Sequence, residues 1–287
     1  MEIANLHAFV AVSETESFSE AAHELFITQS AVSKRISNLE TSLNQKLFDR
    51  IGRSCQLTSV GEALLPKAKQ ILNAIDDAKT TVDTFSTEIS GSLNFGTSHH
   101  IGLHHLPPLL KNFTENYPGV KVNISFLDSE AACEQVLAGK LEFAMVTLPN
   151  KPIENLHQSS LWHDKLSFVI KPGHPWAHAE QVPLTDLANE PAILTSLNTY
   201  TRRILNSQFE LKKIKLQSGI ATNYLETIKM LVGVGLGWSV LPNTMLGPEI
   251  SAFNVKGIAI ARKLGVVTHA QRTLSNAANT FIAIKTS

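Results

Sequence analysis

The segment from Ser17 to Leu57 constrains the fold more than any other part of this 287-residue chain. Ser17 with Glu20 fits a capping box at the start of one helix, and Thr28 can cap a second helix after a tight turn. Apolar residues recur at helical spacing in both, namely Phe18, Ala21, Ala22 and Leu25, then Val32, Ile36 and Leu39. Because small alanines let two helices cross closely, this pattern predicts a helix-turn-helix.

The second predicted helix keeps a polar face open, and a protruding polar helix can enter the major groove of DNA. Gln29 suits adenine, whereas Arg50 and Arg53 on a short basic hairpin suit phosphates or the minor groove. The predicted DNA-binding residues are Thr28, Gln29, Ser30, Ser33, Lys34, Arg35, Arg50 and Arg53. The segment therefore predicts a DNA-binding domain.

The overall charge of this domain gives no support for nucleic-acid binding. Residues 1–90 hold eight basic residues against twelve acidic ones, whereas a uniformly basic domain is the usual footprint. The positive charge is local, with Lys34 and Arg35 on the second helix and Arg50 and Arg53 on the hairpin. We expect DNA binding that weakens with salt, with a modest slope per subunit in a plot of log affinity against log salt concentration.

A long amphipathic helix is predicted after the hairpin, opened by a capping box of Ser59 and Glu62. Its apolar residues alternate in spacings of four and three, and the predicted dimerisation residues are Leu64, Ala68, Ile71, Ile75, Ala78 and Val82. We expect a coiled coil of two chains, which would place two recognition helices about 34 Å apart, or a multiple of it, on one face of DNA. The alternative is a helix that packs on its own domain.

The segment from Ala21 to Leu72 resembles the N-terminal part of LysR-type transcriptional regulators. The motifs that carry the resemblance are the paired alanines, TQSAVS, the LE pair at Leu39 and Glu40, LFDR, and LTSVGE; Ser30 stands where many members have proline. The resemblance extends over essentially the whole chain. It implies an N-terminal all-α winged helix-turn-helix with a long linker helix, and a C-terminal α/β effector domain of two subdomains, like periplasmic binding proteins.

The predicted domains are 1–58 for DNA binding, 59–90 for the linker helix and hinge, and 91–287 for the effector domain. Within the last, subdomain I covers about 91–162 and 266–287, and subdomain II about 163–265. Strands are expected at 93–97, 120–127, 142–147, 166–170, 192–194, 216–220 and 236–241, with helices between them. This alternation predicts mostly parallel sheets with covered faces.

Ligands of open α/β sheets bind beyond the carboxyl ends of the strands, where hydroxyls and helix N-termini favour anions. The effector-binding candidates are Thr97, Ser98, His99, His100, Thr147, Thr195, Ser196 and Asn223. The resemblance implies Ser98, Thr147, Thr195 and Ser196 as ligand contacts, although an ordinary helix cap explains each equally well. Residues 91–287 hold 17 basic and 13 acidic residues, which is consistent with an anionic effector.

Other motifs indicate no metal, cofactor or catalytic site. Among His99, His100, His104 and His105, an i, i+4 pair suits zinc, but no acid or cysteine follows at ligand spacing. The glycines from Gly233 to Gly237 lie between a helix and a strand, which predicts a tight turn rather than a dinucleotide site. Cys133 has no second cysteine in its domain, so redox sensing through an internal disulfide is not expected.

These observations predict a ligand-responsive, sequence-specific transcription regulator of LysR type, without enzyme activity, binding a small anionic effector in the cleft between its subdomains. The resemblance also implies that effector binding shifts subdomain closure, and so the spacing of the DNA-recognition helices in a homotetramer; RNA polymerase is a further candidate partner. A cytoplasmic location is expected, because the chain shows neither an export signal nor a membrane span and has only two cysteines, in separate predicted domains. The resemblance implies a bacterial protein. The alternatives are a solute-binding protein or enzyme, and a DNA-architectural protein whose α/β domain only oligomerises.

Overall fold

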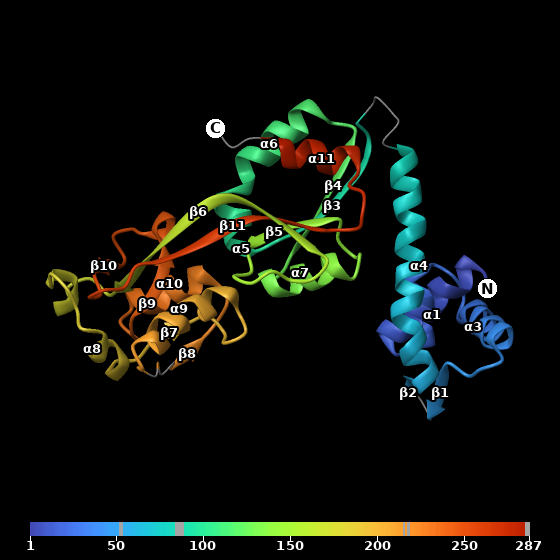
Figure 1. The fold of residues 1–287 in the computed structure, drawn as a ribbon, viewed down its shortest axis with the longest axis horizontal. Helices are drawn as coiled ribbons and strands as arrows, with labels where there is room; N and C mark the ends of the chain where they lie inside the picture. Colours follow the sequence, from blue (N-terminus) through green and yellow to red (C-terminus); the bar gives the residue numbers. More distant parts are fainter. Residues whose placement is uncertain (52–53, 84–88, 215, 217–218, 285–287) are drawn as a thin grey trace. The chain divides into compact units, whose positions relative to one another are not determined.

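The computed structural model describes residues 1–51, 54–83, 89–214, 216 and 219–284. The chain divides into two compact units, Met1–Phe85 and Ser86–Ser287, here called unit 1 and unit 2. Figure 1 shows the elements of each. Among the described residues, no helix combines the length and the apolar character needed to cross a membrane.

Unit 1 is a helical domain with one hairpin. Its elements are α1 (Ile3–Thr15), α2 (Phe18–Glu24), α3 (Gln29–Leu43), β1 (Phe48–Ile51), β2 (Ser54–Leu57) and α4 (Ser59–Asp83). The hydroxyl of Ser17 accepts a hydrogen bond from Glu20 N at 3.3 Å, and that of Thr28 accepts one from Ala31 N at 3.2 Å. Both predicted caps are therefore confirmed, and α2 and α3 form the predicted helix-turn-helix.

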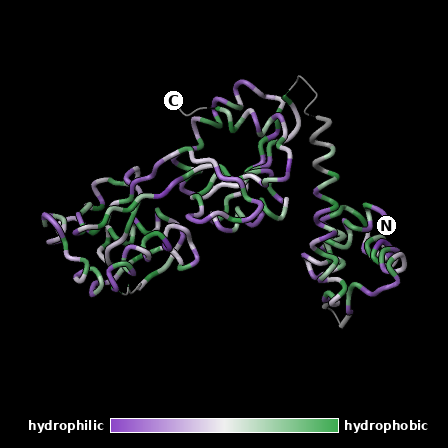
Figure 2. Tube along the Cα trace, viewed as in Figure 1, coloured by the Kyte–Doolittle hydropathy of each residue, from purple (hydrophilic) through white to green (hydrophobic). Residues whose placement is uncertain are grey.

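Helix α1 is an element that the sequence pattern does not reveal. It packs against α2, α3 and α4 at once. Its residues Leu6, Ala8, Phe9 and Val12 are buried. A helix that is apolar on several sides has no single stripe to detect, unlike α3 and α4, along which hydrophobic and hydrophilic residues alternate in Figure 2.

The start of α4 corrects the predicted capping box by one residue. Thr58, and not Ser59, caps the helix: its hydroxyl accepts from Gly61 N at 3.1 Å and donates to Lys46 O at 2.8 Å. Thr58 N in turn donates to Leu47 O at 3.0 Å, which ties the start of α4 to the chain that enters β1.

The predicted dimerisation seam on α4 is partly covered by unit 1 itself. Ala68 is fully buried, and Leu64 packs half-buried against the same core. For these two residues the alternative of a helix packed on its own domain holds. Further along, Ile71 and Ala78 are exposed and Ile75 is half-buried, while the side chain of Val82 lies outside the described ones.

Unit 2 consists of two α/β lobes. The first lobe contains β3 (Gly91–Thr97), α5 (His99–His104), α6 (Leu106–Asn116), β4 (Val120–Phe126), α7 (Ser129–Leu137), β5 (Phe143–Thr147) and α11 (Asn276–Ala283). The second contains η1 (Pro175–His178), α8 (Leu184–Asn189), β7 (Ile193–Leu194), α9 (Tyr200–Leu211), β8 (Ile220–Ala221), α10 (Leu225–Gly233), β9 (Ser239–Pro242), η2 (Asn243–Met245) and β10 (Ser251–Phe253). Two long strands, β6 (Leu156–Ile170) and β11 (Ile260–His269), run through both lobes (Figure 1).

The main sheet is mixed, so the prediction of mostly parallel sheets is wrong. Its strand order is β10-β6-β11-β5-β3-β4, and β9 also pairs with β6. Among the described residues, β3 pairs parallel with β4 and with β5. Strand β11 pairs antiparallel with β5 and β6, and β6 pairs antiparallel with β9 and β10. The small sheet of β7 and β8 is parallel. The expected elements leave out β10 and β11, and they do not reveal that β6 runs antiparallel to β9.

The long strands pair from Ile260 opposite Leu166 to His269 opposite Leu156. Their register shifts between Leu264 and Gly265. A Cβ at Gly265 would lie 2.0 Å from Ser159 O, so only glycine permits this close pairing. The boundaries expected near residues 162 and 265 fall within these two strands.

Each lobe has its own aromatic core. In the first lobe, the rings of Phe95 and Phe143 stack at 4.9 Å, and Phe281 of α11 packs beside Phe95 at 5.2 Å. In the second, Trp238 is fully buried and its Nε1 donates to Leu187 O at 3.1 Å. A core on each side leaves the surface between the lobes free to be polar.

The glycine cluster before β9 forms the tight turn expected from the sequence. Gly235 has a φ of +89°, a conformation that favours glycine. A Cβ at Gly237 would lie 2.3 Å from Pro191 O, so the backbone of this turn approaches the neighbouring chain closely.

We predict that Gly265→Ala destabilises unit 2 by about 1–3 kcal/mol, because its methyl group would push β11 away from β6. Gly119→Ala is the matched control, since nothing lies within 4 Å of a Cβ there. Urea unfolding of both variants measures the difference. Equal midpoints for the two variants would contradict the tight pairing at Gly265.

Candidate functional site

The open face of α3 presents the polar residues of the predicted DNA interface. Gln29, Ser30 and Lys34 are exposed, and Ser33 and Arg35 are half-buried. The opposite face holds Val32, Ile36 and Leu39, which are fully buried in the core of unit 1. The buried stripe therefore fixes which side of α3 faces outward.

Hydrogen bonds order the first turn of α3. Gln29 Nε2 donates to Ser33 Oγ at 3.3 Å, and the hydroxyls of Thr28 and Ser30 lie 3.0 Å apart. The amide of Gln29 retains an oxygen acceptor and a further N–H donor, the pair of groups that matches the edge of adenine.

The hairpin β1–β2 lies on the core of unit 1 through Phe48, whose ring packs 5.5 Å from that of Phe9 and 6.0 Å from that of Phe18. Arg50 lies on β1 opposite Cys55. The side chain of Arg50 and the whole of Arg53 lie outside the parts that the structure describes.

Glu40 joins the end of α3 to the chain before the hairpin. Its carboxylate accepts from Lys46 Nζ at 2.8 Å and from Leu47 N at 2.9 Å. Burial alone would raise the pKa of Glu40, but the hydrogen bonds from Lys46 and from Leu47 N outweigh burial and lower the pKa. The ionised carboxylate thus holds the end of α3 and the chain that enters the hairpin together.

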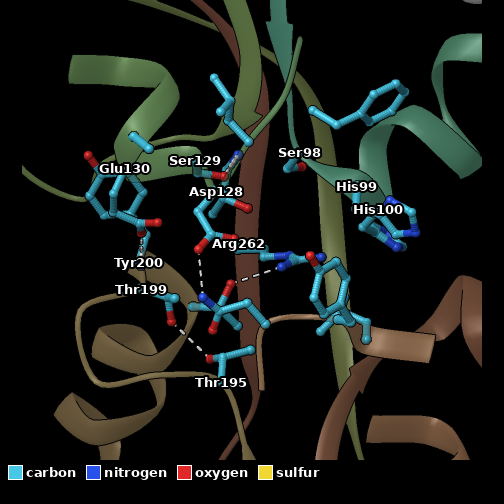
Figure 3. Close-up of a pocket in the computed structure, with 18 residues that line it drawn as sticks. Ser98, His99, His100, Asp128, Ser129, Glu130, Thr195, Thr199, Tyr200 and Arg262 are labelled. Atoms are coloured by element: carbon cyan, nitrogen blue, oxygen red, sulfur yellow. Dashed lines mark hydrogen bonds between the residues drawn. The ribbon is translucent and has the colours of Figure 1, made fainter. Parts of the chain in front are cut away.

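Unit 2 contains a cavity of about 650 Å³ between its two lobes, shown in Figure 3. Its lining includes the residues that precede four helices, namely Ser98 before α5, Asp128 before α7, Thr199 before α9 and Tyr224 before α10. Four helix N-termini therefore point their positive ends at one space. This arrangement suits a ligand with acceptor oxygens or negative charge.

Most of the predicted effector-binding residues line this cavity: Ser98, His99, His100, Thr147, Thr195 and Asn223. Thr97 does not, because it is fully buried and its hydroxyl donates to Met145 O at 3.1 Å. Ser196 does not either; its backbone N–H donates to Asn223 Oδ1 at 3.0 Å.

Several lining residues were not predicted: Asp128, Ser129, Glu130, Thr199, Tyr200 and Arg262. Asp128 is the second residue after β4 and could have been found, because the rule applied to the other strand ends covers it too. Arg262 lies on β11, a strand that the alternating apolar residues Ile260, Leu264 and Val266 could have revealed.

Two acidic side chains of the first lobe bond across the cavity to the second. Asn223 Nδ2 donates to Asp128 Oδ2 at 2.6 Å. The backbone N–H of Tyr200, in the first turn of α9, donates to the carboxylate of Glu130 (Figure 3). Burial raises the pKa of Glu130, and the hydrogen bond from Tyr200 opposes that rise only in part.

The histidine run divides between the surface and the interior. His99 and His104 lie 3.9 and 3.7 Å from the carboxylate of Glu226. His100 is buried, and burial together with the positive charge of Arg262 lowers its pKa to about 2, so its ring is neutral. Among the described residues, no group of three or more side chains is placed to hold a metal ion.

Comparison with known families decides the class of the chain. The model of the LysR substrate binding domain matches residues 86–285, and the model of the bacterial regulatory helix-turn-helix protein of the lysR family matches residues 3–62. The chain belongs to the LysR family of transcriptional regulators. The resemblance seen in the sequence and the predicted fold class are confirmed.

Individual LysR-family relatives match over nearly the whole chain. The uncharacterized HTH-type transcriptional regulator YwqM of Bacillus subtilis (strain 168) is 30% identical over 89% of this chain and 87% of its own. A full-length OxyR variant from Pseudomonas aeruginosa superposes with a TM-score of 0.73, at 19% identity over 100% of this chain and 99% of its own. Full-length CbnR complexed with its target DNA gives 0.65, at 18% identity over 98% of each chain. These two structures show the fold alone.

Both cysteines of this LysR-family chain, Cys55 and Cys133, are buried and neither forms a disulfide. Cys133 of α7 is 1% exposed, and burial raises the pKa of its thiol to about 11. A thiol that stays protonated is a poor nucleophile. Cys55 lies on β2 in the other unit, so the two cysteines are in different folding units.

We predict that Glu130→Gln stabilises unit 2 at neutral pH. A raised pKa in the folded state means that stability is lost as pH rises through that pKa, and glutamine keeps an acceptor for Tyr200 N without the charge. Melting temperatures between pH 4 and pH 8 measure this, with the exposed Glu134→Gln on the same helix as control. A lower melting temperature for Glu130→Gln at pH 8 would contradict the prediction.

A second pH dependence follows from His100. In the unfolded chain, His100 binds a proton below pH 6.5, whereas in the folded chain its lowered pKa keeps it neutral. The free energy of unfolding therefore falls as pH drops below 6.5. Replacing His100 with asparagine should reduce the dependence of the free energy of unfolding on pH by up to about 1.4 kcal/mol per pH unit. Urea unfolding at pH 5 and pH 7 tests it, with the exposed His157→Asn as control. An unchanged slope for His100→Asn would be the contrary result.

Proposed function

We propose that this LysR-type regulator binds DNA through α3 and the hairpin β1–β2, and that a small effector binds in the cavity between the lobes of unit 2. One observation carries the proposal: four helix N-termini and the hydroxyls beside them converge on that cavity. The alternative of a plain solute-binding protein does not explain why the chain carries a helix-turn-helix unit.

The DNA-binding part of the proposal depends on the exposed face of α3. Gln29, Ser30 and Lys34 are free to meet base edges and phosphates, while Thr28 holds the helix start. The structure that contains CbnR and its target DNA shares this fold, which supports the same role here. Arg35, Arg50 and Arg53 are proposed as further phosphate contacts.

The effector part of the proposal depends on the cavity. Its volume of about 650 Å³ is that of a small-molecule site. Helix N-termini and hydroxyls favour an anionic group, and Asp128 and Glu130 at the same cavity disfavour a ligand of high negative charge. A small effector with one negative charge fits both conditions.

Dimerisation through the far part of α4 stays a proposal. Ile71 and Ala78 are exposed there, and a second copy of α4 would cover them. In a tetramer of two such dimers, closure of the lobes around an effector would change the spacing between the α3 helices that bind DNA. Contact with RNA polymerase stays a prediction from the family resemblance.

The DNA interface is tested by two substitutions on α3. Gln29→Ala should lose about 1–3 kcal/mol of discrimination at one base position, and Lys34→Ala should weaken binding to all sequences and lower the salt slope by roughly 1. The exposed Lys111→Ala of unit 2 is the control. Selection of genomic fragments, followed by titration at several salt concentrations, measures this. A wild-type protein that prefers no genomic fragment would refute the proposal.

The cavity is tested by filling it. We expect Ser98→Trp to abolish the rise in melting temperature that some small carboxylate, amino acid or oxyanion gives the wild-type protein. Thr185→Trp, on the exposed side of the second lobe, should respond like the wild type. Compounds that stabilise Ser98→Trp as much as the wild type would show that they bind elsewhere. Retained DNA binding with lost response would favour the regulator over the architectural alternative.

A further inference from the structure

A buried ion pair lies where the two long strands of unit 2 cross the cavity. Arg262 of β11 stands opposite Asp164 of β6, and Arg262 Nε donates to Asp164 Oδ2 at 2.7 Å. Both residues are only 6% exposed. Figure 3 shows Arg262 in the middle of the cavity, between Ser98 and His100 on one side and Tyr200 on the other.

The guanidinium of Arg262 is only partly bonded. Nη1 donates to Thr201 Oγ1 at 2.8 Å, but Nη2 is buried without a hydrogen-bond partner among the described residues. An unmade hydrogen bond from a buried charged group is costly. This arginine therefore keeps donor capacity that the fold itself does not use.

His100 adds unused polar atoms at the same place. Its Nε2 lies 3.9 Å from Asp164 Oδ2, which is too long for a hydrogen bond, and both of its ring nitrogens are buried without a partner in the described part of the chain. The neutral ring offers one N–H donor. Two unsatisfied side chains thus meet on one wall of the cavity.

We infer that Arg262, with His100 beside it, is the anchor for a carboxylate group of the effector. The planar edge of a guanidinium can donate two parallel hydrogen bonds to a carboxylate, as it also can to a phosphate. This inference rests on the proposed effector site and names its ligand class: a small monocarboxylate with an apolar body.

The charges around Arg262 set the preference for a single carboxylate. Asp164 already balances the charge of Arg262, so a ligand anion is stabilised mainly by hydrogen bonds and helix N-termini. Asp128 and Glu130 line the same cavity and would repel a dianion such as phosphate. Phe126, also in the lining, offers an apolar surface for the remainder of the ligand.

The position of Arg262 also couples binding to the lobes. Nη2 is covered by protein atoms, so an acceptor reaches it only with a small shift of the surrounding chain. Arg262 and Asp164 lie on the strands that both lobes share, and Thr201 lies in α9 of the second lobe. A carboxylate bound here would therefore act on the joint between the lobes.

The experiment uses the full chain and defined probes: benzoate, phenylacetate, butyrate and hexanoate, the amide of each, and inorganic phosphate. Melting temperature and calorimetric titration measure binding. We expect at least one monocarboxylate to bind the wild type, with its amide and phosphate binding at least tenfold more weakly. Arg262→Gln should weaken that binding roughly 10- to 100-fold, the value of a charge-assisted hydrogen bond.

Two further variants keep the result clear. The double variant Asp164→Asn with Arg262→Gln removes both buried charges together, so it tests the anchor without leaving Asp164 unpaired in the interior. Lys263→Gln removes one positive charge from the exposed face of the same strand and should bind the probe as the wild type does. Full binding by the double variant would overturn the inference, as would equal binding of acid and amide or no response to any carboxylate.

Binding of the wild type to genomic DNA fragments is measured beside these titrations. If the protein selects DNA but ignores every monocarboxylate, the anchor is refuted and the proposed function stands. If it binds a carboxylate through Arg262 but selects no DNA, the proposed function fails and the anchor stands.

Discussion

The antiparallel pairing of β6 with β11 is the interaction on which the architecture of unit 2 depends. It runs from Leu156 opposite His269 to Leu166 opposite Ile260, through both lobes. Each lobe has its own hydrophobic core, so this pairing is what places the two sets of helix N-termini on one cavity. The close contact at Gly265 and the buried pair of Arg262 with Asp164 lie on these same strands.

The cavity combines attraction for one negative charge with resistance to more. Helix ends and hydroxyls supply the attraction, while Asp128 and Glu130 are held across the space by Asn223 and by the N–H of Tyr200. A ligand that competes for those donors would release first-lobe acids from second-lobe helices. The contacts that join the lobes in the absence of a ligand are thus the contacts that a bound effector would change.

The sequence predicted the helix-turn-helix well, because Ser17, Thr28 and the apolar stripe of α3 are local signals that tertiary packing does not change. It missed α1, whose apolar residues face several neighbours, and β11, whose long pairing with β6 is a non-local property. Strand ends located Ser98, Thr147 and Thr195 at the cavity. They could not locate Arg262, because its place at the cavity depends on its pairing with Asp164 on the neighbouring strand β6.

Native-state hydrogen exchange of the full chain tests most directly whether the β6–β11 pairing holds the two lobes around one cavity. The account predicts that amides of residues 162–166 and 260–264 are among the slowest to exchange in unit 2, as slow as those of the buried strand β5. Rapid exchange in those two segments, with both lobe cores still protected, would mean that the lobes are held together by something else and would contradict the account.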